Sequence, residues 1–129
     1  MSSNAPILVV DDDTTLRRIL VLHLEALGIS ADSAADGIEA YKLVLENNYE
    51  LILMDVEMPN MNGLQAASAI RELERLESRP ALPIVAITAR GASREQCVAA
   101  GMIAYYEKPI QADIVKQIVQ EFASQLLDA

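Results

Sequence analysis

Several residues that could carry out chemistry come directly after short apolar runs of this sequence. Asp11, Asp12 and Asp13 follow PILVV, and Asp55 follows LILM. Carboxylates that lie close together repel one another, which raises their pKa values unless a cation is present. A hard divalent ion with oxygen ligands removes this repulsion, and Mg²⁺ suits one or two carboxylates together with waters and phosphate oxygens. The acidic residues therefore point to a magnesium site, provided that the fold brings them together.

Two further polar residues end apolar runs in the same way. Thr88 ends LPIVAIT, and Lys108 follows IAYYE. A carboxylate beside a metal ion can attack phosphorus as a nucleophile. Phosphoryl transfer then depends on positioning and on neutralising the charge of the phosphoryl oxygens, which Mg²⁺ and the ammonium group of Lys108 can do. Each residue alone has a simpler explanation, such as a helix cap for Asp13, but their shared position favours chemistry.

The elements that must position these residues can be read from the hydrophobic pattern. Short apolar runs predict strands, amphipathic stretches predict helices, and Asp36 and Asn62 are suited to cap the second and third helices. Near-continuous apolar strands between helices predict a parallel sheet covered on both faces, a doubly wound α/β sandwich. Ligands bind such sheets beyond the carboxyl ends of the strands. The predicted strands are residues 6–10, 29–34, 49–54, 82–88 and 103–107, and the predicted helices are residues 16–27, 37–48, 63–76, 92–102 and 113–127.

Length and composition limit the class of protein. The 129 residues suit one compact domain, and a hydrophobic content of 52% excludes a disordered segment as the main identity. No apolar run approaches the eighteen residues of a membrane span. The first residues, MSSNAP, lack the basic and apolar regions of a signal peptide, so we expect a cytoplasmic location.

The rarest residues and the charge exclude several kinds of site. Cys97 and His23 are the only cysteine and histidine, which rules out an intrachain disulfide, a cysteine-built zinc site and histidine-based triads. We expect Cys97 to be a small buried residue. The net charge of −9 disfavours nonspecific binding to nucleic acid or to anionic membrane. Residues 71–80, RELERLESRP, mix charge signs, and we expect them to be solvated rather than ion-paired.

One alternative chemistry starts from the first acidic run. Asp11, Asp13 and Thr15 fit the pattern D-x-D-x-T and resemble the first motif of haloacid-dehalogenase-type phosphatases. Asp11 would then be the nucleophile and Asp13 the acid/base, with Thr88 and Lys108 in later motifs. That family also needs an insertion after the first strand and a further acidic motif after the lysine. Here a helix follows the strand directly, and the best acidic candidates after the lysine lie in helix-like sequence.

The whole chain resembles a different family. ILVVDDD, LILMDVEMPNMNGL, IVAITA and AGMIAYYEKPI resemble, in order and spacing, the receiver (response-regulator) domains of two-component signalling. The resemblance covers residues 6–127, and the ordered set of motifs is far more specific than any one of them. It implies a flavodoxin-like strand order 2-1-3-4-5 with five helices, and Mg²⁺ as the cofactor, for which Mn²⁺ can substitute.

The resemblance also assigns roles to individual residues. Asp55 matches the phosphoacceptor, which takes a phosphoryl group from a phosphohistidine. Asp11 and Asp12 match the acidic pair that binds Mg²⁺, with Asp12 the more direct ligand. Asp55 is implied to supply another ligand and the backbone carbonyl of Glu57 one more. Lys108 matches the lysine that pairs with the phosphoryl group.

A second group of residues matches the parts of a receiver that respond to phosphorylation. Thr88 matches the switch hydroxyl that turns towards the phosphoryl group, and Tyr105 matches the aromatic switch. Tyr106 should point the opposite way, because side chains alternate along a strand. The resemblance further implies a cis peptide bond between Lys108 and Pro109.

Two positions beside the expected site are less predetermined. Glu57 and Arg90 lie two residues beyond Asp55 and Thr88, at positions that tune the attacking water in this family. We hypothesise that they pair across the site and slow loss of the phosphoryl group, with plain solvation as the alternative. Ala89 is small, as access to an aspartyl phosphate requires.

The resemblance implies a signalling switch and not a turnover enzyme. It divides the chain into an N-terminal tail (residues 1–5), a receiver domain (residues 6–127) and a C-terminal tail (residues 128–129). A histidine kinase or histidine-phosphotransfer domain is the expected partner on the side of the first helix, where Leu16 is expected to be an exposed contact. A downstream protein is expected on the face of the fourth helix, fifth strand and fifth helix.

The type of receiver stays open at this point. A stand-alone regulator and a receiver from a larger protein both fit, and AGMIAYYEKPI and RELERLESRPALP are closer in style to receivers of hybrid sensor histidine kinases. A scaffold that keeps the fold without using the switch is a further alternative.

Overall fold

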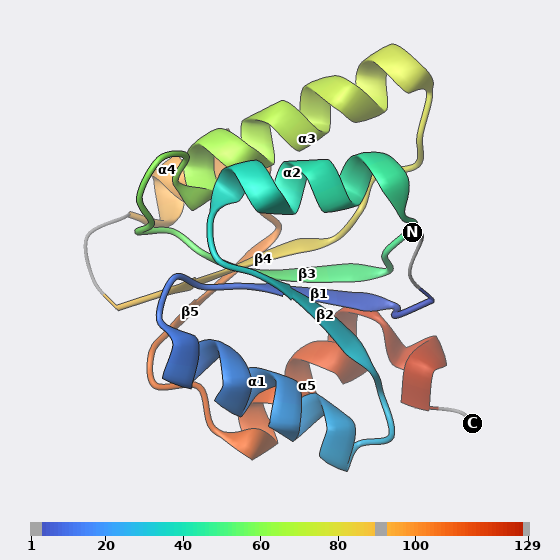
Figure 1. Ribbon diagram of the computed structural model, residues 1–129, viewed down its shortest axis with the longest axis vertical. Coiled ribbons are helices and arrows are strands. Elements are labelled where there is room, and N and C mark those ends of the chain that lie inside the picture. Colours follow the sequence, from blue (N-terminus) through green and yellow to red (C-terminus); the bar gives the residue numbers. More distant parts are fainter. Residues whose placement is uncertain (1–3, 90–92, 128–129) are drawn as a thin grey trace.

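The computed structural model describes residues 4–89 and 93–127. The elements in chain order are β1 (Ile7–Val10), α1 (Thr14–Ala26), β2 (Ala31–Ala34), α2 (Gly37–Glu46), β3 (Leu51–Asp55), α3 (Gly63–Glu77), β4 (Ile84–Thr88), α4 (Arg94–Ala99), β5 (Ala104–Glu107), α5 (Ala112–Phe122) and the 3₁₀ helix η1 (Ser124–Leu127). The strands pair in parallel in the order β2-β1-β3-β4-β5, which confirms the predicted topology. In Figure 1, α1 and α5 cover one face of the sheet, and α2, α3 and α4 cover the other.

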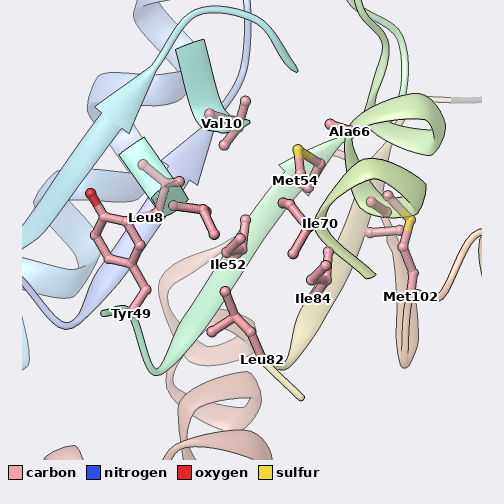
Figure 2. Packing of buried hydrophobic residues seen from close by; sticks show 14 of the residues in the cluster. Leu8, Val10, Tyr49, Ile52, Met54, Ala66, Ile70, Leu82, Ile84 and Met102 are labelled. Carbon is pink, nitrogen blue, oxygen red and sulfur yellow. The ribbon is translucent and has the colours of Figure 1, made fainter. Parts of the chain in front are cut away.

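The strands are held by two apolar cores, one on each face of the sheet. Leu8 and Ile52 are completely buried on the face that α2 and α3 cover, where they pack in one cluster with Ile70 of α3 (Figure 2). Val9 and Leu53, one position further along each strand, belong to the cluster beneath α1 and α5. Burying a side chain of this size stabilises the fold by about 1.5–3 kcal/mol. Packing on both faces therefore fixes the strands, and with them the positions of the residues at the strand ends.

Capping residues set the starts of the helices. The predicted caps are confirmed, because the Asp36 side chain accepts a hydrogen bond from the N–H of Glu39 and Asn62 forms a reciprocal capping box with Gln65. The first helix begins at Thr14, earlier than predicted, because its N-cap lies directly before it in the acidic run. Among the residues that the structure describes, no helix is both long and apolar enough to cross a membrane.

The prediction for the last helix is wrong in its final part. α5 ends at Phe122 and not at residue 127, because Ala123 adopts φ −151° and ψ 45°, outside the helical region. The chain continues as η1, in which Leu126 and Leu127 pack against the core beneath α1 and α5. The leucines of this segment are therefore half-buried against the core without continuing the α-helix.

The prediction that residues 71–80 are simply solvated is also wrong. Glu74 is buried, and it accepts hydrogen bonds from Arg71 and from the backbone N–H of Leu82. Arg79 donates to the carbonyls of Val44 and Leu45, which lie in the last turn of α2. The end of α3 packs against the loop into β4, so one side of this charged helix is an interior surface.

Candidate functional site

The predicted site residues converge at the carboxyl end of the sheet. Asp55 is the last residue of β3, and Asp11 directly follows the neighbouring strand β1. Asp11, Asp12 and Asp55 each offer a carboxylate oxygen, and these oxygens all lie within 4.8 Å of one another. Asp11 and Asp55 are buried, whereas Asp12 is exposed. The fold thus gathers three carboxylates at one point on the rim.

The charge of Asp55 is unfavourable at this position. Only 3% of the residue is exposed. Burial, and then the nearby charge of Asp11, raise the pKa of Asp55 to about 6, although Lys108 and the N–H of Glu57 oppose this shift. The N–H of Glu57 is 3.4 Å from Asp55 Oδ1, a long hydrogen bond. The carboxylate is therefore only weakly compensated by its protein neighbours.

Lys108 is the positive group inside the site. Its Nζ lies 2.8 Å from Asp11 Oδ2 and 3.3 Å from Asp55 Oδ2. Burial lowers the pKa of Lys108, but the two carboxylates raise it by more, so it lies above its usual value. The backbone N–H of Lys108 donates to the carbonyl of Thr88 at 2.8 Å, and the bond between Lys108 and Pro109 is cis, as expected.

Two buried oxygens of the site have no hydrogen-bond partner within the described part of the chain. They are Asp11 Oδ2 and Thr88 Oγ1. Lys108 Nζ lies 2.8 Å from Asp11 Oδ2, so this oxygen is paired by charge, whereas Thr88 Oγ1 has neither a hydrogen bond nor an ion pair among the described residues. An unsatisfied buried polar atom is costly, so Thr88 Oγ1 marks where a ligand fits. An all-oxygen carboxylate cluster suits a hard cation such as Mg²⁺.

The turn after β3 is built around a close backbone contact. A Cβ atom on Gly63 would lie 2.1 Å from the carbonyl oxygen of Asp55, so α3 can begin this close to β3 only with glycine at that position. Asn60 has a φ of 65°, which reverses the chain, and its side chain donates to Asp36. Met61 is partly buried and packs against the core. The turn leads the chain away from the acidic cluster.

The two tyrosines of β5 point to opposite faces of the sheet, as predicted. Tyr105 packs against the core beneath α2 and α3, and Tyr106 packs against the core beneath α1 and α5. Glu57 is exposed, which fits both the tuning role and plain solvation. Arg90 lies outside the described residues.

Sequence reasoning missed one contact with the acidic cluster and misjudged another residue. Arg17 Nη1 donates to the backbone carbonyl of Asp11 at 2.6 Å. A basic residue one turn after the helix cap is the only sequence signal of this bond, and it is weak. Leu16 is half-buried and not exposed, whereas Ile19 and Leu22 on the same helix are 38% and 48% exposed.

Comparison with known proteins agrees with this geometry. The family profile of the response regulator receiver domain matches residues 7–120. The chain belongs to this family. The sensor histidine kinase RcsC of Escherichia coli strain K12 is 34% identical over 122 residues, which are 93% of this chain and 12% of the kinase. The receiver domain thus spans about one eighth of that relative's length.

Solved receiver structures have the same fold. The receiver domain of Ssk1 from Saccharomyces cerevisiae, crystallised with the histidine phosphotransfer protein Ypd1, matches with a TM-score of 0.87 and 26% identity, covering 95% of this chain and 93% of that chain. The response regulator TrrA of Thermotoga maritima, in complex with Mg²⁺-BeF, matches with a TM-score of 0.79 and 32% identity, covering 90% of this chain and 96% of that chain. The sheet order predicted from the resemblance is therefore that of a receiver.

The local structure argues against the phosphatase alternative. That chemistry needs Asp13 as a free acid/base, but the Asp13 side chain is the N-cap of α1 and accepts a hydrogen bond from the N–H of Leu16 at 3.1 Å. α1 follows β1 after only three residues, so there is no insertion at this point. Both findings fit a receiver.

Proposed function

We propose that this domain is a phosphorylation-dependent switch in which Asp55 accepts a phosphoryl group from a phosphohistidine. The observation that carries the proposal is the convergence of Asp55, two further carboxylates and Lys108 on one rim of a receiver fold. The functional unit is residues 6–127. Its activity is its own phosphorylation and dephosphorylation, and it is not a turnover enzyme.

The buried carboxylate is the nucleophile. An oxygen of Asp55 attacks phosphorus while the bond from phosphorus to the histidine nitrogen breaks, so the phosphoryl group moves and the histidine recovers its electron pair. The residues that would hold Mg²⁺ are Asp11, Asp12 and Asp55, and the resemblance adds the backbone carbonyl of Glu57. Mg²⁺, when bound, neutralises charge on the phosphoryl oxygens. Lys108, already 3.3 Å from Asp55, pairs with the transferred group.

The hydroxyl of Thr88 couples the site to the rest of the domain. It is completely buried and has no hydrogen-bond partner among the described residues, so a phosphoryl oxygen gives it an acceptor. When Thr88 moves towards that oxygen, it leaves space into which the side chain of Tyr105 moves. This is a population shift between two conformations. The surface of α4, β5 and α5 then changes, and it carries exposed apolar residues at Val98 and Ile103.

The partner that supplies the phosphoryl group is a histidine kinase or a histidine-phosphotransfer domain. Support comes from the Ssk1 receiver, which was crystallised with such a phosphotransfer protein. On this chain the exposed Ile19 and Leu22 of α1 offer apolar contacts for that partner. The output partner is a protein that binds the α4-β5-α5 face.

The lifetime of the aspartyl phosphate is tuned beside the site. Glu57 and Arg90, each two residues beyond Asp55 and Thr88 in the sequence, are proposed to slow hydrolysis by pairing with each other. Solvation of both side chains is the alternative. Equal half-lives of the aspartyl phosphate in Glu57→Ala, Arg90→Ala and the unmodified protein would remove this role.

Phosphorylation in vitro tests the proposal. The protein is incubated with Mg²⁺ and a small acyl phosphate, and the modified residue is mapped by mass spectrometry. Label on Asp55, absent from Asp55→Asn and from samples without a divalent ion, is the expected result. Label on Asp11 would instead support the phosphatase chemistry, and absence of label would support a scaffold that no longer uses the switch.

A further inference from the structure

Arg17 reaches back from α1 to the start of the acidic cluster. Its Nη1 donates to the backbone carbonyl of Asp11 at 2.6 Å, a charge-assisted hydrogen bond. The residue is half-buried, and its backbone N–H donates to the carbonyl of Asp13, within the first turn of the helix. The helix therefore holds the guanidinium against the turn between β1 and α1.

The carbonyl that Arg17 binds belongs to the peptide unit that joins the two metal-binding aspartates. This unit is planar, so holding the carbonyl oxygen of Asp11, whose N–H is also held, sets the plane of the unit and the direction of the Cα of Asp12. The other side of Asp11 is already held, because its N–H donates to Ala34 and its Oδ1 accepts from the N–H of Asp13. Arg17 completes the set of contacts that orients the turn from which the exposed Asp12 side chain projects.

Arg17 and Lys108 act on the same residue in different ways. Lys108 contacts carboxylate oxygens, which a cation would also use. Arg17 contacts only the carbonyl of Asp11 in this cluster and leaves the carboxylate oxygens available. By charge alone, a nearby arginine weakens the binding of Mg²⁺. By orientation, it strengthens that binding. The two effects have opposite signs, so they can be separated.

We infer that Arg17 is a positioning residue, which strengthens Mg²⁺ binding by fixing the peptide between Asp11 and Asp12. The inference rests on the proposed function, because it concerns the same metal site. Outer contacts of this kind typically change metal affinity by about tenfold to a hundredfold. The orienting effect of Arg17 outweighs its charge repulsion.

The test is a titration of the full chain with Mg²⁺ alone, measured by calorimetry, for four proteins. Arg17→Ala removes the guanidinium, and Arg17→Met keeps an apolar stem that packs like that of arginine. Arg18→Ala is the matched control, because it removes the same charge from the next, exposed position. Urea unfolding in a chelator accompanies each titration, since a merely structural role would lower stability without changing the dissociation constant of the folded protein.

The expected result is a dissociation constant about tenfold higher in both Arg17 variants, with Arg18→Ala equal to or slightly tighter than the unmodified protein. If the Arg17 variants bind Mg²⁺ as tightly as Arg18→Ala does, the inference is wrong and the proposed function stands. If Arg17→Ala does not fold, Arg17→Met decides by the same comparison. If the unmodified protein binds no Mg²⁺, both the inference and the metal site of the proposed function fail.

Discussion

Two buried carboxylates in this molecule have contrasting surroundings. Glu74 on α3 accepts hydrogen bonds from Arg71 Nη1 at 2.8 and 3.0 Å and from the N–H of Leu82 at 2.7 Å. Asp55, at the end of β3, has a 3.4 Å hydrogen bond from Glu57 and shares Lys108 with Asp11. The first carboxylate is fully partnered by the protein, and the second is not.

The difference separates a structural charge from a functional one. Arg71 also donates to the carbonyl of Gly101. The Glu74 network therefore ties α3 to the loop before β4, at Leu82, and to the loop after α4, at Gly101. At Asp55 the protein leaves binding capacity for a ligand and keeps a carboxylate whose pKa is raised to about 6. Incomplete pairing of a buried carboxylate in this fold therefore marks the site, and complete pairing marks the scaffold.

The largest expected effect is on the structural side of this comparison. Glu74→Ala removes the acceptor of Arg71 Nη1 and of the N–H of Leu82, although Arg71 keeps its bonds to the carbonyl of Gly101. Breaking a buried pair in this way costs about 3–5 kcal/mol. Urea unfolding measures the change in the free energy of unfolding. Glu72→Ala is the control, because Glu72 pairs with Arg75 on the exposed side of the same helix, and water screens such pairs so that they contribute little to stability. Equal losses in the two variants would remove the distinction between the paired interior and the surface.

Removing the charge of Asp55 should instead increase the free energy of unfolding. Its folded-state pKa of about 6, against 3.8 in the unfolded chain, means that the folded protein binds the proton more tightly. Protonated Asp55 therefore favours the folded state, and this stabilisation is lost as pH rises from about 4 to 6. Above pH 6 the buried charge lowers the free energy of unfolding by a constant amount. A shift of this size corresponds to about 3 kcal/mol. In a chelator, Asp55→Asn should be more stable than the unmodified protein by about this amount at pH 7.

The pH dependence provides the check on Asp55. The stability difference between Asp55→Asn and the unmodified protein, measured by urea unfolding, should grow between pH 4 and 6 and stay level above. Glu25→Gln, which neutralises an exposed carboxylate of α1, should show no such growth. A difference that does not depend on pH would show that the charge of Asp55 is already well compensated.

The sequence predicted those features that depend on local chemistry or on strand order. Caps such as Asp36 and Asn62 act within one helical turn, so their residue types suffice to place them. The meeting of Asp11 and Asp55 followed from parallel strands, whose carboxyl ends share an edge. The sequence alone therefore predicts where these two carboxylates meet.

The remaining features depend on packing that a linear pattern does not contain. Glu74 lies in a mixed-charge helix, and nothing in its neighbours along the chain reveals that the loop into β4 covers it. The bond from Arg17 to Asp11 depends on a side-chain rotamer and on the shape of the intervening turn. The half-buried Leu16 and the exposed Ile19 differ in their positions around and along α1. These contacts are tertiary, so the order of residues along the chain does not reveal them.

The most direct test of the central claim is the stability of the protein as a function of Mg²⁺ concentration at pH 7.5. If the carboxylates of the site are incompletely paired because they bind a cation, Mg²⁺ should stabilise the folded protein. The free energy of unfolding should rise by about 1.4 kcal/mol at a Mg²⁺ concentration ten times the dissociation constant. Asp12→Asn, which alters an exposed ligand of the cluster, should lose most of this rise. An unmodified protein whose stability does not respond to Mg²⁺, or an Asp12→Asn variant that responds equally, would contradict the account.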